Sequence, residues 1–185
     1  MAYIVSLHAL NLNVIENALQ GGTDLHVIEN LTSENQYLRG LVSGEMWTYI
    51  KSLSNDNLVE IRGDFSRAFV QLVTILAAPT SHTQYSNAGG RKYRDDFIEG
   101  TLKEKLNGYD TFNFIDRPIC RLVAKDAYPC WGFVTFSELC ELSNLINAID
   151  ITGFNDSDEE EWGTAIISAM KQALKQNSDL IFIYN

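Results

Sequence analysis

The side chains in this sequence with the greatest capacity for nucleophilic or metal chemistry are three cysteines and three histidines. Cys120, Cys130 and Cys140 are ten residues apart, whereas zinc sites usually pair ligands two to four residues apart and need four of them. The histidines are scattered, and none lies in an H-x-x-x-H or H-E-x-x-H pattern. We therefore expect no metal and no cofactor, and we interpret the cysteines as small apolar side chains.

A catalytic triad is formally available, with Cys130 as nucleophile, His82 as base and one of the many carboxylates as the orienting acid. Any chain with these residue types offers such a combination, and geometry rather than presence identifies a triad. The residues around Gly89 and Gly90 lack the G-x-x-x-x-G-K-[ST] pattern that binds phosphate. We assign no catalytic residue and favour a protein that is not an enzyme.

Negative charge is concentrated in one quarter of the chain. The 45 residues from Asp126 to Met170 hold nine carboxylates and no Lys or Arg, and the formal net charge of the whole chain is -10. Such a field attracts basic surfaces and repels phosphate backbones. Eight of the fourteen basic residues lie between Arg91 and Lys125, but six carboxylates are interleaved with them, which makes a poor nucleic-acid patch. The charge distribution indicates a protein partner with a basic surface.

The acidic run from Asp156 to Glu161 is the most concentrated part of this charge. It lacks the alternating ligands and central glycine of an EF-hand calcium loop. Ser157 and Glu160 have capping-box spacing, and carboxylates are favourable in the first turn of a helix. We expect a helix to begin here and its exposed carboxylates to contact the partner; the candidates are Asp156, Asp158, Glu159 and Glu160.

A competing prediction is a small-molecule-binding or enzymatic domain with a pocket near residues 128–135. Its candidate residues are Tyr128, Cys130 and Trp131, because the two aromatic rings could wall a cleft. Aromatic side chains more often pack in a core or at its rim.

Length and composition favour one domain, residues 1–185, since 45% of the residues are hydrophobic and no low-complexity linker divides the chain. The N-terminal residues show no export signal, and no run of about 18 apolar residues indicates a transmembrane helix. An odd number of cysteines fits a reducing cytoplasm. We expect a cytoplasmic protein.

Hydrophobic periodicity predicts several helices packed on a small sheet. The chain termini should supply two of its strands, since an apolar strand needs ladder partners. The expected fold class is α+β or α/β. The predicted helices are 12–19, a turn or two at 24–30, a segment that begins near 33 and ends at Gly44, 64–78, 93–106, 136–149 and 158–176. The predicted strands are 3–7, 112–115, 121–123, 132–134 and 180–184. Residues 81–90 are polar and end in two glycines, which predicts a surface loop.

The stretch from Tyr128 to Leu139 reads YPCWGFVTFSEL. Its Pro-x-x-Gly-aromatic-aliphatic-Ser/Thr-x-x-Glu pattern, followed by a helix, resembles small bacterial proteins of unknown function described as YfbM-like. The opening strand and helix and the closing helix and strand are also similar to that family. The resemblance implies a fold but no catalytic residues, and its Pro129 and Gly132 have a structural role, as a fixed turn and a permissive backbone before a helix.

These observations together favour a non-catalytic bacterial protein that binds a protein partner through its acidic surface. An immunity or antitoxin-like protein that covers a basic toxin surface is one such class, because charge complementarity raises association rates and selects partners. The sequence leaves the oligomeric state open.

Overall fold

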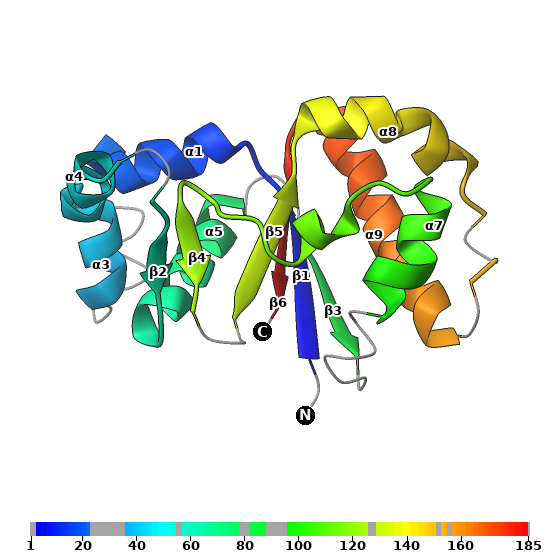
Figure 1. Cartoon of the computed structure of the whole chain (residues 1–185), viewed down its shortest axis with the longest axis horizontal. Helices are drawn as coiled ribbons and strands as arrows, with labels where there is room; N and C mark the ends of the chain where they lie inside the picture. Colours follow the sequence, from blue (N-terminus) through cyan, green and yellow to red (C-terminus); the bar gives the residue numbers. More distant parts are fainter. Residues whose placement is uncertain are drawn as a thin grey trace.

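A four-stranded antiparallel sheet forms the centre of the molecule in the computed structural model (Figure 1), which describes residues 3–22, 36–54, 57–77, 82–87, 96–125, 129–150, 153–154 and 157–184. The strand order is β3-β1-β6-β5. The strands are β1 (Tyr3–Ala9), β3 (His82–Asn87), β5 (Cys130–Val134) and β6 (Leu180–Tyr184). β1 and β6 pair with each other, with Val5 opposite Tyr184, which confirms that both ends of the chain contribute to the sheet.

Two short strands form a separate parallel pair beside β5 in Figure 1. They are β2 (Val59–Ile61) and β4 (Leu122–Ala124). A two-residue turn precedes β4, in which Cys120 and Arg121 both have positive φ. The Arg121 guanidinium donates to the carbonyl of Ile50 at 2.9 Å and to that of Asn57 at 2.9 Å, which fixes the approach to β2.

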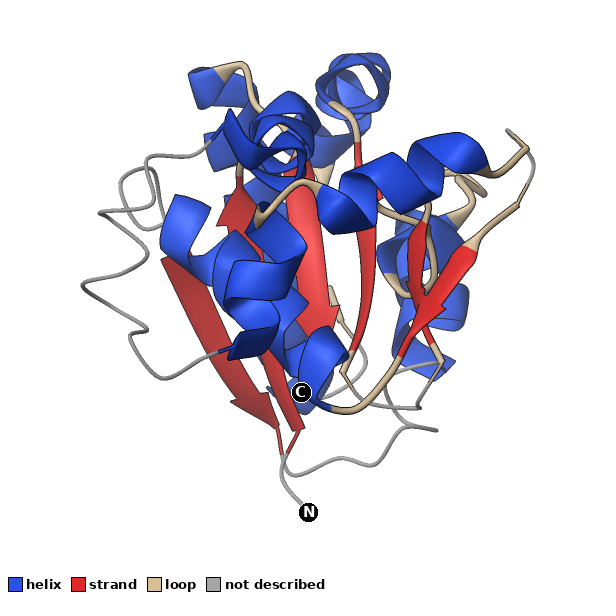
Figure 2. Cartoon of the chain, turned by 90° about the vertical axis from the view of Figure 1, so that its left-hand side faces the viewer, coloured by secondary structure: helices blue, strands red, loops and turns tan. Residues whose placement is uncertain are grey.

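Helices cover both faces of the sheet (Figures 1 and 2), which confirms the α+β class. One layer contains α8 (Phe136–Ala148), α9 (Ser157–Gln176), α7 (Lys103–Lys105) and the short helical segments η2 (Phe97–Leu102) and η3 (Thr111–Phe114). The other contains α1 (Leu12–Asn17), η1 (Ala18–Gly22), α3 (Gln36–Val42), α4 (Glu45–Ser52) and α5 (Asp64–Ala77). None of the described helices is long and apolar enough to cross a membrane.

The side chains of β6 belong to both cores. Phe182 and Tyr184 pack in the core beneath α9, and Ile181 and Ile183 pack in the core beneath α5. Successive strand side chains point to opposite faces, so a strand covered on both sides needs apolar residues at every position. The apolar run at the C-terminus is therefore a central strand, as the sequence predicts.

Two predicted segments differ from the structure. Residues 82–87, predicted as loop, form the edge strand β3, whose backbone pairs with β1 from Tyr3 opposite Asn87 to His8 opposite His82. Residues 112–115, predicted as a strand, lie in and just after the 3-10 helix η3. In both cases a tertiary neighbour decides the backbone conformation: β1 offers an edge to β3, and β5 packs directly against η3.

Candidate functional site

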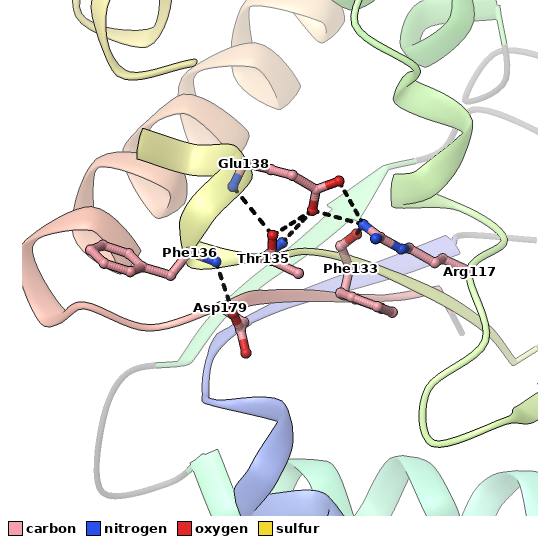
Figure 3. A network of polar contacts seen from close by, with 6 residues as sticks. All are labelled: Arg117, Phe133, Thr135, Phe136, Glu138 and Asp179. Atoms are coloured by element: carbon pink, nitrogen blue, oxygen red, sulfur yellow. Dashed lines mark hydrogen bonds and ion pairs between the residues drawn. The ribbon is translucent and has the colours of Figure 1, made fainter. Parts of the chain in front are cut away.

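A polar network joins the end of β5 to the start of α8 (Figure 3). Thr135 is the N-cap of α8, and its Oγ1 accepts a hydrogen bond from the Glu138 backbone N–H at 3.2 Å. The Glu138 carboxylate accepts a hydrogen bond from the Thr135 N–H at 2.8 Å in return. This reciprocal capping box satisfies two helix-terminal N–H groups and confirms the predicted start of the helix.

Arg117 connects this cap to the segment after η3. Its Nη1 donates to both oxygens of Glu138, at 3.0 and 2.8 Å, and to the Phe133 carbonyl at 3.2 Å. The guanidinium carbon lies 4.1 Å from the centroid of the Phe133 ring. Partial burial opposes ionisation of Glu138, but the hydrogen bonds from Thr135 and Arg117 outweigh it and lower the pKa of the carboxyl group.

Asp179 completes the network from the residue before β6. Its Oδ1 accepts from the Phe136 N–H at 2.8 Å, and its Oδ2 accepts from the Leu12 N–H at 2.8 Å. One carboxylate thus caps α8 and α1 together, whereas Asn11, which occupies the N-cap position of α1, makes no side-chain capping bond. Helix N-termini present unsatisfied N–H groups and partial positive charge, so an anion between two of them is favourable.

Two titratable groups here, Glu138 and the nearby Tyr109, have pKa values shifted further from neutral pH. Burial, followed by the nearby charge of Glu138, raises the pKa of Tyr109 to about 12, while that of Glu138 is lowered. Neither group exchanges a proton readily near pH 7. We therefore assign the network to holding β5, α8 and the chain termini in place.

Of the predicted pocket residues, the structure describes Trp131 and Cys130, and Trp131 lies in the core. Trp131 is 3% exposed, its indole N–H donates to the Leu122 carbonyl at 3.2 Å, and its ring lies 4.7 Å from that of Phe69. It is therefore a core residue, and the prediction that it walls a cleft is wrong. Cys130 is partly exposed in β5, and Tyr128 lies outside the described residues.

Gly132 follows Trp131 in β5. A glycine is required there because a side chain would have no space, and not because the backbone needs glycine's conformational freedom. A Cβ atom there would overlap the Asn113 carbonyl oxygen and the Phe114 backbone. η3 therefore packs directly on the backbone of β5, and Gly132 serves this packing.

The acidic candidates divide into exposed and buried residues. Asp158 and Glu160 are exposed in the first turn of α9, as is the neighbouring Glu161. Glu159 is only 9% exposed, and its Oε1 accepts a hydrogen bond from Thr101 Oγ1 at 3.1 Å. The prediction that Glu159 is among the most exposed carboxylates is wrong, since the helix turns this side chain toward η2. Asp156 lies outside the described residues.

A shallow groove that sequence reasoning missed lies between α4, β2 and α5. It has a volume of about 530 Å³ and is lined by Met46, Tyr49, Phe65 and the run from Leu58 to Arg62. Tyr49 and Leu58 are 54% and 53% exposed, the highest values for large hydrophobic residues in the described ranges. The alternation of apolar and charged residues from Val59 to Arg62 is the sequence signal for an exposed strand here.

Within the described residues, no group of three or more His, Cys, Asp or Glu side chains gathers where it could hold a metal ion. Comparison with protein-family models, with curated proteins and with solved structures gives no match. The resemblance to YfbM-like proteins therefore stays a prediction.

Proposed function

We propose that this protein binds a protein partner with a basic surface through the N-terminal end of α9. The observation that carries the proposal is the exposure of Asp158, Glu160 and Glu161 within a stretch that has no Lys or Arg. A bacterial immunity or antitoxin-like protein, acting in the cytoplasm on a basic toxin, is the class that this chemistry fits best.

Gly153 and Phe154, which precede α9 in the chain, pack against Lys105 and against α9 itself. Lys105 Nζ donates to the Gly153 carbonyl at 2.7 Å and lies 4.7 Å from the centroid of the Phe154 ring. The Phe154 ring also occupies the space where a side chain on Gly163 of α9 would lie. Packing of this kind lowers the entropy lost when a partner binds.

Lys105 is engaged with a backbone carbonyl and an aromatic ring of this segment. Glu160 and Glu161 make no ion pair with any residue that the structure describes. Their charge is therefore available to an approaching cation. Exposed charges of this kind mainly accelerate encounter, and salt screens them over about 8 Å at physiological ionic strength.

The test is a comparison of association kinetics at increasing salt, after a partner has been identified by capture from the source cells at low salt. The association rate of the wild type should fall as salt rises, and Glu160→Lys with Glu161→Lys should slow association at low salt. Asp110→Lys with Asp116→Lys is the matched control, because it makes the same charge change at two exposed carboxylates outside α9.

Helix stability needs its own control, since lysines oppose the dipole at a helix N-terminus. Glu160→Gln with Glu161→Gln removes the charges without reversing them, and should give an intermediate association rate. If association is independent of salt and both charge-reversed proteins bind like the wild type, the acidic surface has no part in binding and the proposal fails.

A further inference from the structure

The groove between α4, β2 and α5 follows the edge of β2. Its lining includes every residue from Leu58 to Arg62. Successive side chains of a strand point to opposite faces, so a groove on one face would be lined by alternate residues. The unbroken run places the groove along the strand edge instead.

The hydrogen-bond pattern of β2 distinguishes the edge that pairs with β4 from the opposite edge, which pairs with no described strand. The Val59 N–H donates to the Arg121 carbonyl at 2.9 Å, and the Ile61 carbonyl accepts from the Lys125 N–H at 2.9 Å. Alternate residues of a strand bond to the same neighbour, so the backbone N–H and carbonyl of Glu60 point away from β4. No described residue pairs with these two groups.

The walls of the groove select a slender, apolar occupant. Met46 and Tyr49 of α4 line the groove together with Phe65 of α5 and the exposed Leu58. An edge flanked by helices in this way admits one extended segment, whereas the sheet of a second copy would bring its own α4 against this one. Unpaired strand edges of this kind pair with extended peptides.

The two charged side chains beside the edge of β2, those of Glu60 and Arg62, differ in whether they form an ion pair. The Glu60 carboxylate is held by Lys125, with Nζ and Oε2 2.5 Å apart. Arg62 is exposed at the end of the groove and makes no ion pair with residues of the described ranges. The hydrogen bond and charge of Lys125 lower the pKa of the Glu60 carboxyl group, and Arg62 also lies near enough to help lower it. Two cations and one carboxylate therefore flank the edge, and the net charge there is positive and complements a carboxylate.

We propose that the edge of β2 binds an extended peptide segment of a partner protein, which adds a third strand beside β2. The segment has apolar side chains at alternating positions, which enter the groove, and a carboxylate that pairs with Arg62. This surface belongs to the α4 and α5 layer, on the opposite side of the sheet from α9, so it is independent of the acidic surface.

The experiment measures binding of fluorescent decapeptides to the full chain by anisotropy. The panel alternates valine or leucine with polar residues, and each peptide is made with a central aspartate or with lysine in its place. The aspartate peptides should bind more tightly. Glu60→Pro should weaken binding by about tenfold or more, because it removes the edge N–H without removing a β2–β4 bond. Glu60→Ala keeps that N–H and releases Lys125, so it should bind the aspartate peptides at least as tightly as the wild type.

Leu58→Ser should also weaken binding, and Phe112→Ser is its matched control, since Phe112 is 49% exposed outside the groove. If circular dichroism shows that Glu60→Pro is misfolded, peptides N-methylated at alternate positions are used instead. Methylation of the peptide nitrogens that face β2 should abolish binding, and methylation of those that face away from β2 should not. The proposal is overturned if no peptide of the panel binds or if blocking the edge leaves binding intact. It is also overturned if sedimentation shows a dimer that Leu58→Ser dissociates, since a second copy would then cover the edge.

Discussion

Asp179 is the residue whose replacement tests the architecture most directly, because one carboxylate caps two helices from opposite layers. Both of its oxygens accept hydrogen bonds at 2.8 Å, from the first residues of α1 and of α8. Loss of one N-terminal cap typically costs about 1 kcal/mol, with a range of about 0.5–2. Asp179→Ala should therefore lower the free energy of unfolding by about 2 kcal/mol, the sum for two separate helices.

The measurement is urea denaturation followed by tryptophan fluorescence, with the change expected in the midpoint at constant slope. Asp179→Asn should be intermediate, because its amide offers an acceptor to one helix and a mismatched donor to the other. Asp110→Ala is the matched control, since Asp110 occupies the N-cap position of η3 without a side-chain capping bond. A loss below about 0.5 kcal/mol for Asp179→Ala, similar to ordinary surface substitutions, would refute the double-cap reasoning.

Three further predictions concern individual groups. Glu138 has a lowered pKa, so its contribution to stability is present above the ordinary value of 4.5 and is lost as pH falls below it. Denaturation series between pH 6 and 3 should show a shallower acid dependence for Glu138→Gln, and an unchanged slope would contradict the assignment. Gly132→Ala should destabilise the protein by about 1–3 kcal/mol through overlap with η3. Gly100→Ala, where nothing lies within 4 Å of the added carbon and the backbone is helical, should keep or slightly raise the melting temperature, and thermal melts of both variants check this. Burial, followed by the charge of Glu16, raises the pKa of the Cys120 thiol to about 12, whereas Cys140 is exposed. A thiol reagent near pH 8 should modify Cys140 much faster than Cys120, and rapid labelling that survives Cys140→Ser and maps to Cys120 would reject this order.

The sequence by itself determined those elements whose signals are local. The apolar stripe from Phe65 to Leu76 predicts α5, and the Thr135 and Glu138 pair predicts the start of α8. The continuous apolar run in Leu180–Tyr184 predicts a strand covered on both faces. Periodicity and capping act within one or two helical turns, so they can be read without knowledge of the rest of the chain.

Only the tertiary structure decided the features that depend on residues far apart in the chain. Asp179 caps α1 in place of Asn11, although it lies 167 positions from Leu12 in the sequence. Pairing with β1 makes the polar segment 82–87 the edge strand β3. Trp131 and Glu159 carry side chains that could serve a cleft or an acidic surface, but the packing of α5 and η2 buries them. Burial and long-range capping are set by which surfaces meet in space, and side-chain type alone does not specify that meeting.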